Sequence, residues 1–194
     1  VQIIVSRMPF IGGYLPHYDG TDATIVTLIR LPRIVLGLTA GISLAVSGSS
    51  MQGIFKNPMA SPFILGVSAG GAFGAAVGIF LGMSMYILPL IAFIFAMGTA
   101  FTVFLLGRVG SRTDISTLLL AGLAMNFLMT ALTSYVLFLS DPMDRMGIVC
   151  WMWESLNGTY WEEVLIALPL IIFGTIMVYA YSRELNVIQT GEES

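Results

Sequence analysis

Polar residues able to bind or react are rare in this chain, and the most concentrated of them lie in two short stretches. Arg30 and Arg33 flank a proline in the tetrapeptide RLPR, while Gln52, Lys56 and Asn57 follow shortly downstream. The first stretch offers two permanent positive charges. The second stretch offers amide hydrogen bonds and a single positive charge. Neither supplies the paired acid and base that enzymatic bond cleavage requires.

The isolated reactive side chains do not add an enzyme site. His17 is the only histidine, and Cys150 is the only cysteine, which excludes an intrachain disulfide and a zinc cluster. No G-x-x-x-x-G-K-[ST] sequence occurs, so the chain does not bind ATP through a P-loop. We therefore expect no catalytic residues, no metal site and no cofactor.

Composition places the chain in a membrane. Hydrophobic residues make up 57% of it and charged residues 10%, and the mean hydropathy is +0.91. Soluble domains carry about 25% charged residues, so this chain has too few to cover a water-facing surface. Its net charge of −3, without a basic stripe, excludes nucleic acid as a partner. The lipid bilayer is the expected environment.

A membrane span needs about 20 apolar residues. About five segments of the chain qualify, and we expect an all-α polytopic membrane protein. None of the five contains Asp, Glu, His, Lys or Arg, which argues against an intramembrane enzyme such as a lipid-processing one. A plain helical scaffold stays open as a further alternative. The expected spans are residues 34–55, 63–83, 86–107, 115–139 and 164–181.

Small residues recur every four positions in the first two spans, and residues four apart share one face of a helix. Such faces let neighbouring backbones approach closely, so we expect both helices to pack inside a bundle. In the first span these residues are Gly37, Gly41, Ala45 and Ser49, and in the second they are Gly66, Gly70, Gly74, Gly78 and Gly82.

Two prolines interrupt the chain between the first and second spans. Pro58 and Pro62 cannot continue a helix, so we expect the first helix to end near Phe55. Ser61 can cap the next helix, with Pro62 at its first position. Residues 56–62 are thus predicted to form a tight turn at the membrane surface.

The fourth span carries a polar stripe and begins with a capping residue. Gly122, Asn126, Met129 and Thr133 share one face, which must meet protein or water because lipid would leave the Asn126 amide unsatisfied. Packing within one subunit and a water-filled path are both open. Asp114 precedes Ile115 and Ser116 and is expected to cap this helix.

The RLPR segment and the proline-containing turn at residues 56–62 belong to one longer signature. The segment "LIRLPRIVLGLTAGISLAVSGSSMQGIFKNPMASPFILGVSAGG" resembles that of the FecCD-type permeases, which have R-L-P-R, then G-x-x-L-A-x-S-G-x-x-x-Q, then N-P-L-A-x-P-x-x-L-G. Met59 replaces the usual leucine. The segments "STLLLAGLAMN", "WMWESLNGTYWEEV" and "SRELNVIQTGEES" extend the resemblance over nearly the whole chain. Gln52, Asn57 and Pro58 belong to the signature turn.

The resemblance implies a fold and an orientation. Such permeases, including the BtuC type, have ten spans, so residues 1–194 would be a single incomplete permease domain holding the second to sixth spans at 34–181. Residues 1–33 would be an outer loop, and 182–194 would begin a cytoplasmic coupling loop. Lysine and arginine counts do not fix the orientation, because four lie on each side of the membrane under this arrangement.

The resemblance also implies partners and site roles. A FecCD-type permease is not an enzyme: it pairs with a second permease subunit, two separate ATPase subunits and an extracytoplasmic binding protein in the cytoplasmic (inner) membrane. Arg30 and Arg33 would dock the binding protein, although they could instead anchor to lipid headgroups. The remaining implied roles are a translocation path at Asn126, Met129 and Thr133, a cytoplasmic gate at Asp114, Ile115 and Ser116, and the start of ATPase coupling at Gly191 and Glu192.

The transported substrate stays open at the level of sequence. A metal chelate, meaning a ferric siderophore, haem or cobalamin, is the first expectation from the resemblance. The same architecture also carries oxyanions of the molybdate or tungstate type. Whether the permease is a homodimer or pairs with a paralogue is equally open.

Overall fold

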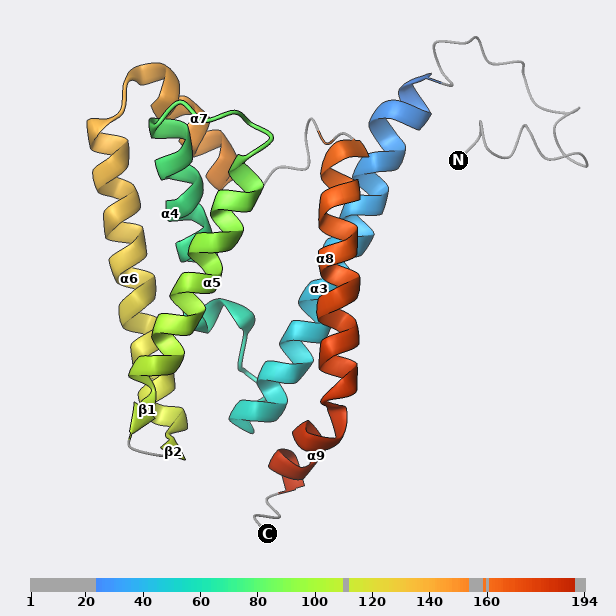
Figure 1. The fold of residues 1–194 in the computed structure, drawn as a ribbon, viewed down its shortest axis with the longest axis vertical. Helices are drawn as coiled ribbons and strands as arrows, with labels where there is room; N and C mark the ends of the chain where they lie inside the picture. Colours follow the sequence, from blue (N-terminus) through green and yellow to red (C-terminus); the bar gives the residue numbers. More distant parts are fainter. Residues whose placement is uncertain (1–23, 110–111, 154–158, 160, 191–194) are drawn as a thin grey trace, which may run out of the picture. The chain divides into compact units, whose positions relative to one another are not determined.

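The computed structural model describes residues 24–109, 112–153, 159 and 161–190. Most of the described residues are helical (Figure 1). A π-helix, η2 (Ile25–Arg30), leads into α3 (Leu31–Phe55), and a 3-10 helix, η3 (Pro62–Leu65), leads into α4 (Val67–Phe80). The elements that follow are α5 (Leu88–Leu106), β1 (Arg108–Val109), β2 (Arg112–Thr113), α6 (Ile115–Leu139), α7 (Pro142–Met152), α8 (Trp161–Ala180) and α9 (Ser182–Thr190).

The prediction of an all-α polytopic fold is confirmed in the described residues, apart from one short hairpin. Four stretches are long and apolar enough to cross a membrane: Ile25–Phe55, α5, α6 and α8. β1 and β2 are two residues each and pair antiparallel, Arg108 opposite Thr113. A short antiparallel strand pair therefore lies between α5 and α6.

The second predicted span, residues 63–83, is interrupted. Gly66 has φ +69°, which ends η3 and separates it from α4, and Gly82 has φ +66° just beyond the end of α4. Glycine adopts positive φ without a steric penalty, so the same residue type that suits a close-packed helix also ends one. At 14 residues, α4 is about 21 Å long, shorter than the roughly 30 Å of a hydrocarbon core.

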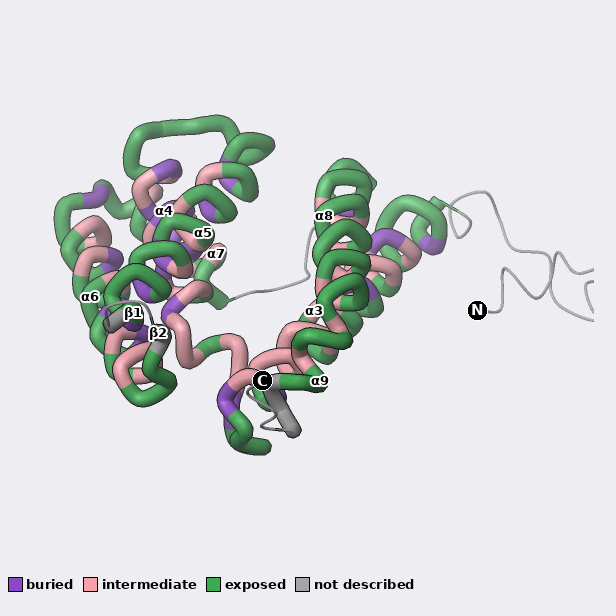
Figure 2. Tube along the Cα trace, turned by 60° about the horizontal axis from the view of Figure 1, so that its bottom comes forward, coloured by how far each residue is buried: buried purple, intermediate pink, exposed green. Residues whose placement is uncertain are grey.

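The chain divides into two compact units, Val1–Ser47 with Leu156–Val187 and Gly48–Ser155 with Ile188–Ser194. In the second unit α4 packs against α5, α6 and α7 (Figure 1). Burial is concentrated along α4 (Figure 2), where six of its fourteen residues are buried. α4 is therefore the core element of this unit, although it is too short to be a simple span.

The glycine face predicted for the second span is confirmed at its three central positions. Gly70, Gly74 and Gly78 are buried against α5. A Cβ added at Gly74 would lie 2.7 Å from the Cβ of Phe95, and one at Gly78 would lie 2.6 Å from Leu88 Cδ2. Both distances are shorter than real Cβ atoms show, so a larger residue at Gly78 would displace the Leu88 side chain, and one at Gly74 would collide with the Phe95 Cβ and the Ile91 backbone.

The matching prediction for the first span is wrong at two of its positions in the first unit. Gly41 and Ala45 are exposed, and a Cβ added at Gly41 would meet no atom within 4 Å. Small residues at a spacing of four permit close packing, but a neighbouring backbone must also be present. In the first unit, this face of α3 is open.

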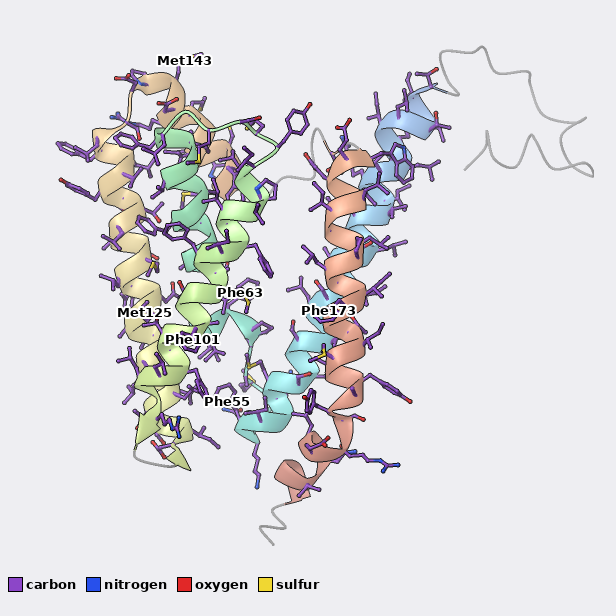
Figure 3. The ribbon with its side chains drawn as sticks, viewed as in Figure 1. Phe55, Phe63, Phe101, Met125, Met143 and Phe173 are labelled. Atoms are coloured by element: carbon purple, nitrogen blue, oxygen red, sulfur yellow. The ribbon has the colours of Figure 1, made fainter. Side chains whose placement is uncertain are left out.

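Large apolar side chains cover much of the surface of both units. Phe101 on α5 is 63% exposed and Phe173 on α8 is 65% exposed (Figure 3). A water-soluble domain would hide side chains of this size, whereas hydrocarbon solvates them. The surface therefore agrees with the composition in placing these helices in a bilayer.

Candidate functional site

The two arginines of the RLPR segment lie at the junction of two helix types. Arg30 is the last residue of η2, and Arg33 lies in the first turn of α3. Pro32 between them is fully buried, whereas Arg30 is exposed and Arg33 is half-buried. The proline thus fixes the backbone while the flanking side chains stay near the surface.

The predicted signature turn brings its polar residues together around one hollow. The hollow has a volume of about 390 Å³ and lies at the C-terminal end of α3. Asn57 Oδ1 accepts a hydrogen bond from the Met59 N–H at 2.9 Å, and the Asn57 N–H donates to the Gln52 carbonyl at 3.2 Å. The residues that line the hollow are Ser49, Gln52, Gly53, Lys56, Asn57 and Pro58.

Lys56 gives this turn its direction. Its φ is +48°, the only positive value outside glycine in the described residues. This left-handed conformation reverses the chain after α3 and is usually supplied by glycine. Ser61 then caps η3, as its hydroxyl accepts from the Phe63 N–H at 3.4 Å, so the predicted cap serves a 3-10 helix rather than an α-helix.

The polar stripe of α6 faces the interior of its own unit in part. Gly122 backs onto η3 so closely that an added Cβ would lie 2.5 Å from the Ile64 carbonyl oxygen. Thr133 is 2% exposed, and its hydroxyl donates to the Met129 carbonyl one turn earlier at 2.8 Å. Asn126 and Met129 are half-buried. Gly122 and Thr133 therefore pack against other parts of the same subunit.

The start of α6 has the predicted cap. The Asp114 carboxylate accepts hydrogen bonds from the Thr117 N–H at 2.8 Å and the Thr117 hydroxyl at 2.7 Å. These bonds, the side-chain one first, lower the pKa of Asp114. A lowered folded-state pKa contributes stability above the unfolded pKa, and this contribution is lost as the pH falls through the folded pKa. Ile115 and Ser116 follow the cap and are exposed.

The other end of α6 is closed by a residue that sequence reasoning did not single out. Arg145 Nε donates to the Leu137 carbonyl at 3.0 Å, and its Nη2 donates to the Ser140 carbonyl at 3.1 Å. Carbonyls at a helix C-terminus lack helical partners and carry partial negative charge. Arg145 therefore fixes the α6–α7 corner.

We expect Arg145→Met to lower the free energy of unfolding by about 1 to 2 kcal/mol, because it removes two charge-assisted hydrogen bonds and a favourable helix-end charge. Arg145→Lys should recover only part of this loss, since an ammonium lacks the planar fork that spans two carbonyls. Thermal unfolding in detergent measures both variants. Equal melting temperatures for Arg145→Met and the parent protein would rule out the capping role.

The remaining predicted positions contribute less. Gly191 and Glu192 lie outside the described residues. Cys150 is exposed on α7. Among the residues with described side chains, no group of three or more His, Cys, Asp or Glu could hold a metal ion.

Comparison with known proteins gives this set of sites a context. Residues 6–194 match the FecCD transport family. The chain belongs to the FecCD transport family. The resemblance seen in the sequence motifs is thus confirmed over nearly the whole chain. A solved structure, described as an inward-facing conformation of a metal-chelate type ABC transporter, superposes with a TM-score of 0.81 at 32% identity, covering 96% of this chain and 59% of that one.

Several relatives in the family carry names that specify a substrate. The cobalamin import system permease protein BtuC of Halobacterium salinarum is 44% identical over 174 residues, 89% of this chain and 47% of the relative. The molybdate import system permease protein MolB of Haemophilus influenzae is 34% identical over 177 residues, with coverages of 90% and 52%. The hemin transport system permease protein HmuU of Yersinia pestis is 36% identical over 173 residues, with coverages of 85% and 51%. The chain spans about half the length of these relatives.

Proposed function

We propose that this chain forms part of the membrane permease subunit of a binding-protein-dependent ABC importer. The observation that carries the proposal is the FecCD match over residues 6–194, together with relatives that are named import or transport permeases. In this role the chain performs no chemistry. ATP hydrolysis by two separate subunits shifts the permease between inward-open and outward-open states, as a ligand biases a two-state element.

The proposed cargo is a metal chelate of the cobalamin, haem or ferric siderophore type. Support comes from the 44% identity to a cobalamin permease and from the metal-chelate type of the superposed transporter. A molybdate-type oxyanion is the second candidate, because a molybdate permease is 34% identical over 90% of the chain. Uptake into proteoliposomes that hold the full-length permease, its ATPase and its binding protein separates these cargoes. Transport of molybdate but not of cobalamin, haem or a ferric siderophore would overturn the first choice.

The proposed site roles follow the transport direction in the cytoplasmic (inner) membrane. Arg30 and Arg33 dock the loaded binding protein at the outer surface. Two copies of the permease, or one copy and a paralogue, meet to form the path and its inner gate. Residues 1–194 form a single, incomplete permease domain in this proposal. The path is assigned to Asn126 and Met129 and not to Thr133, which is buried within its own unit. The gate is assigned to Asp114, Ile115 and Ser116, and the start of the ATPase contact to Gly191 and Glu192.

In this proposal the α7 end of the second unit faces outward, and the signature turn faces the cytoplasm. Met143, at the start of α7, is 85% exposed (Figure 3), and Lys56 is exposed in the turn. After Cys150→Ser, a cysteine introduced by Met143→Cys is expected to react with an impermeant thiol reagent added to intact cells, whereas Lys56→Cys is expected to react only in opened cells. The reverse labelling pattern would overturn the orientation.

A further inference from the structure

The hollow at the C-terminal end of α3 is lined by hydrogen-bond donors that the surrounding protein does not use. Gln52, Lys56 and Asn57 line it, and all three are exposed. Among the described residues, no acceptor or carboxylate pairs with the Gln52 amide, the Lys56 ammonium or the Asn57 Nδ2. An ammonium carries three donors and each amide carries two. No aspartate or glutamate occurs in residues 23–113, so this part of the chain supplies no counter-charge for Lys56.

The backbone of the turn fixes these donors and removes competing negative charge. Asn57 Oδ1 accepts from the Met59 N–H at 2.9 Å, which identifies the oxygen end of the amide and leaves its NH₂ group for another partner. Carbonyls at a helix C-terminus carry partial negative charge, which disfavours an anion. Here the Gly53 and Gln52 carbonyls accept from the Lys56 and Asn57 N–H groups at 3.3 and 3.2 Å. The turn thus satisfies two of these carbonyls itself.

The size and position of the hollow fit a phosphate-bearing headgroup. Its volume of about 390 Å³ lies within the range of roughly 300 to 1,000 Å³ that is typical of small-molecule sites. A phosphodiester carries one negative charge and oxygens that accept hydrogen bonds, which complements one ammonium and two amides. The turn follows directly on the apolar stretch Ile25–Phe55, so it lies where a span ends and lipid phosphates are concentrated.

Large apolar side chains lie beside the polar hollow. Met59 follows Pro58 in the turn and is 83% exposed, and Phe63 in η3 is 50% exposed (Figure 3). A free phosphate ion gains nothing from such neighbours, whereas a phospholipid brings acyl chains that can contact them. The combination of a polar hollow and an apolar rim therefore favours an amphipathic ligand.

We propose that this hollow binds the phosphate of an anionic phospholipid headgroup. Lys56 supplies the positive charge, Gln52 and Asn57 donate hydrogen bonds, and Met59 and Phe63 contact the acyl chains. The same donors accept free phosphate, so the shared chemistry is that of a phosphate oxyanion, and the apolar rim separates the two sources. Anionic lipids of the cytoplasmic leaflet attract basic side chains at the membrane surface, which agrees with the orientation proposed for this turn. The site depends neither on the cargo nor on the binding protein.

The test uses the full-length permease, purified with its ATPase in detergent and titrated with dioleoylphosphatidylglycerol. Native mass spectrometry counts the lipid that each variant retains. Lys56→Asn removes the ammonium but keeps a residue type that tolerates positive φ, and is expected to lower the affinity about fivefold or more. Lys56→Arg keeps the charge and should stay within about twofold of the parent protein. Melting temperatures without added lipid report fold damage separately.

Two further variants separate a formed site from general attraction and lipid from free ion. Arg108→Gln removes a positive charge from an exposed residue of β1 in the same unit and should leave lipid retention unchanged. Met59→Ser keeps the Met59 N–H that holds Asn57 but removes the apolar contact. It should weaken retention of phosphatidylglycerol and leave the response of the melting temperature to inorganic phosphate unchanged.

Each outcome decides the proposal. Loss of lipid in K56N, with retention in K56R and R108Q, supports it. Equal losses in K56N and R108Q would show attraction by overall charge and overturn it. Phosphate binding that Lys56→Asn weakens, together with lipid retention that Met59→Ser leaves unchanged, would assign the hollow to the free ion. Unchanged lipid retention in K56N, with loss of the ATPase from the purified complex, would assign it to an acidic residue of that partner and overturn the lipid site. All of these results leave the importer assignment intact.

Discussion

Replacing Arg30 and Arg33 by glutamate in the full-length permease is expected to weaken docking of its binding protein at least tenfold. Under the proposed docking role, each replacement turns a favourable surface charge pair into a repulsive one. Two exposed charges about 4 Å apart interact by about 1 kcal/mol in water and by a few times that near a protein surface. Because 1.4 kcal/mol corresponds to a factor of ten, two reversals exceed this threshold. Equilibrium titration of the purified transporter with binding protein measures the change.

Salt and location supply the controls for this prediction. The deficit should shrink as salt rises, since the Debye length falls from about 10 Å at 0.1 M to about 3 Å at 1 M. Lys56→Glu is a charge-matched reversal at the signature turn and should leave binding-protein affinity unchanged. Basal ATP hydrolysis should also persist in the arginine variant. Unchanged affinity at low salt would instead identify the two arginines as headgroup anchors.

Replacing Gly74 by leucine is expected to prevent stable folding of the subunit. The Cβ alone would lie 2.7 Å from the Phe95 Cβ and 3.0 Å from the Ile91 carbonyl oxygen. A backbone oxygen cannot swing aside as a flexible side chain does, so α4 and α5 would have to separate. Overpacking of this kind costs about 1 to 3 kcal/mol or more. Accumulation in the membrane and melting temperature in detergent should both fall sharply.

Gly98 provides a matched control on the facing helix. It lies on α5, is exposed, and an added Cβ there would meet no atom within 4 Å. Gly98→Leu makes the same change in size and helix propensity without the collision. We expect this variant to accumulate and melt close to the parent protein. Equal effects of the two substitutions would show that the α4–α5 contact is not what makes Gly74 sensitive.

Sequence reasoning succeeded where one physical cause dominates. Long apolar runs without charge predicted the helices at α5, α6 and α8, because hydrocarbon tolerates little else. The hydroxyl and carboxylate at Ser61 and Asp114 predicted caps, because these side chains satisfy backbone donors next to them in sequence. Each of these signals is local, so the chain alone carried enough information.

The sequence-based predictions failed where the structure depends on contacts between residues far apart in the chain. Gly66 and Gly70 look alike in sequence, yet Gly66 adopts positive φ at a break and Gly70 lies in a packed helix. The role of Arg145 depends on how α7 turns back on α6. The hydrogen bond from Trp161 Nε1 to the Thr27 carbonyl spans 134 positions of sequence. Residue type and spacing do not contain these distances. Only the folded chain brings the donors to their carbonyls.

The break between η3 and α4 limits which part of the bilayer can surround it, because exposed backbone groups are not tolerated in hydrocarbon. Around Gly66 the regular ladder of backbone hydrogen bonds is interrupted, and hydrocarbon chains offer no hydrogen bonds to replace it. A Cβ at Gly66 would lie 3.0 Å from the Asn126 backbone nitrogen and 3.2 Å from the Gly122 carbonyl oxygen. The backbone of α6 thus covers the break at close range. This contact excludes lipid acyl chains from the exposed backbone groups at Gly66. A side chain at Gly122 large enough to push η3 away would let acyl chains reach those groups.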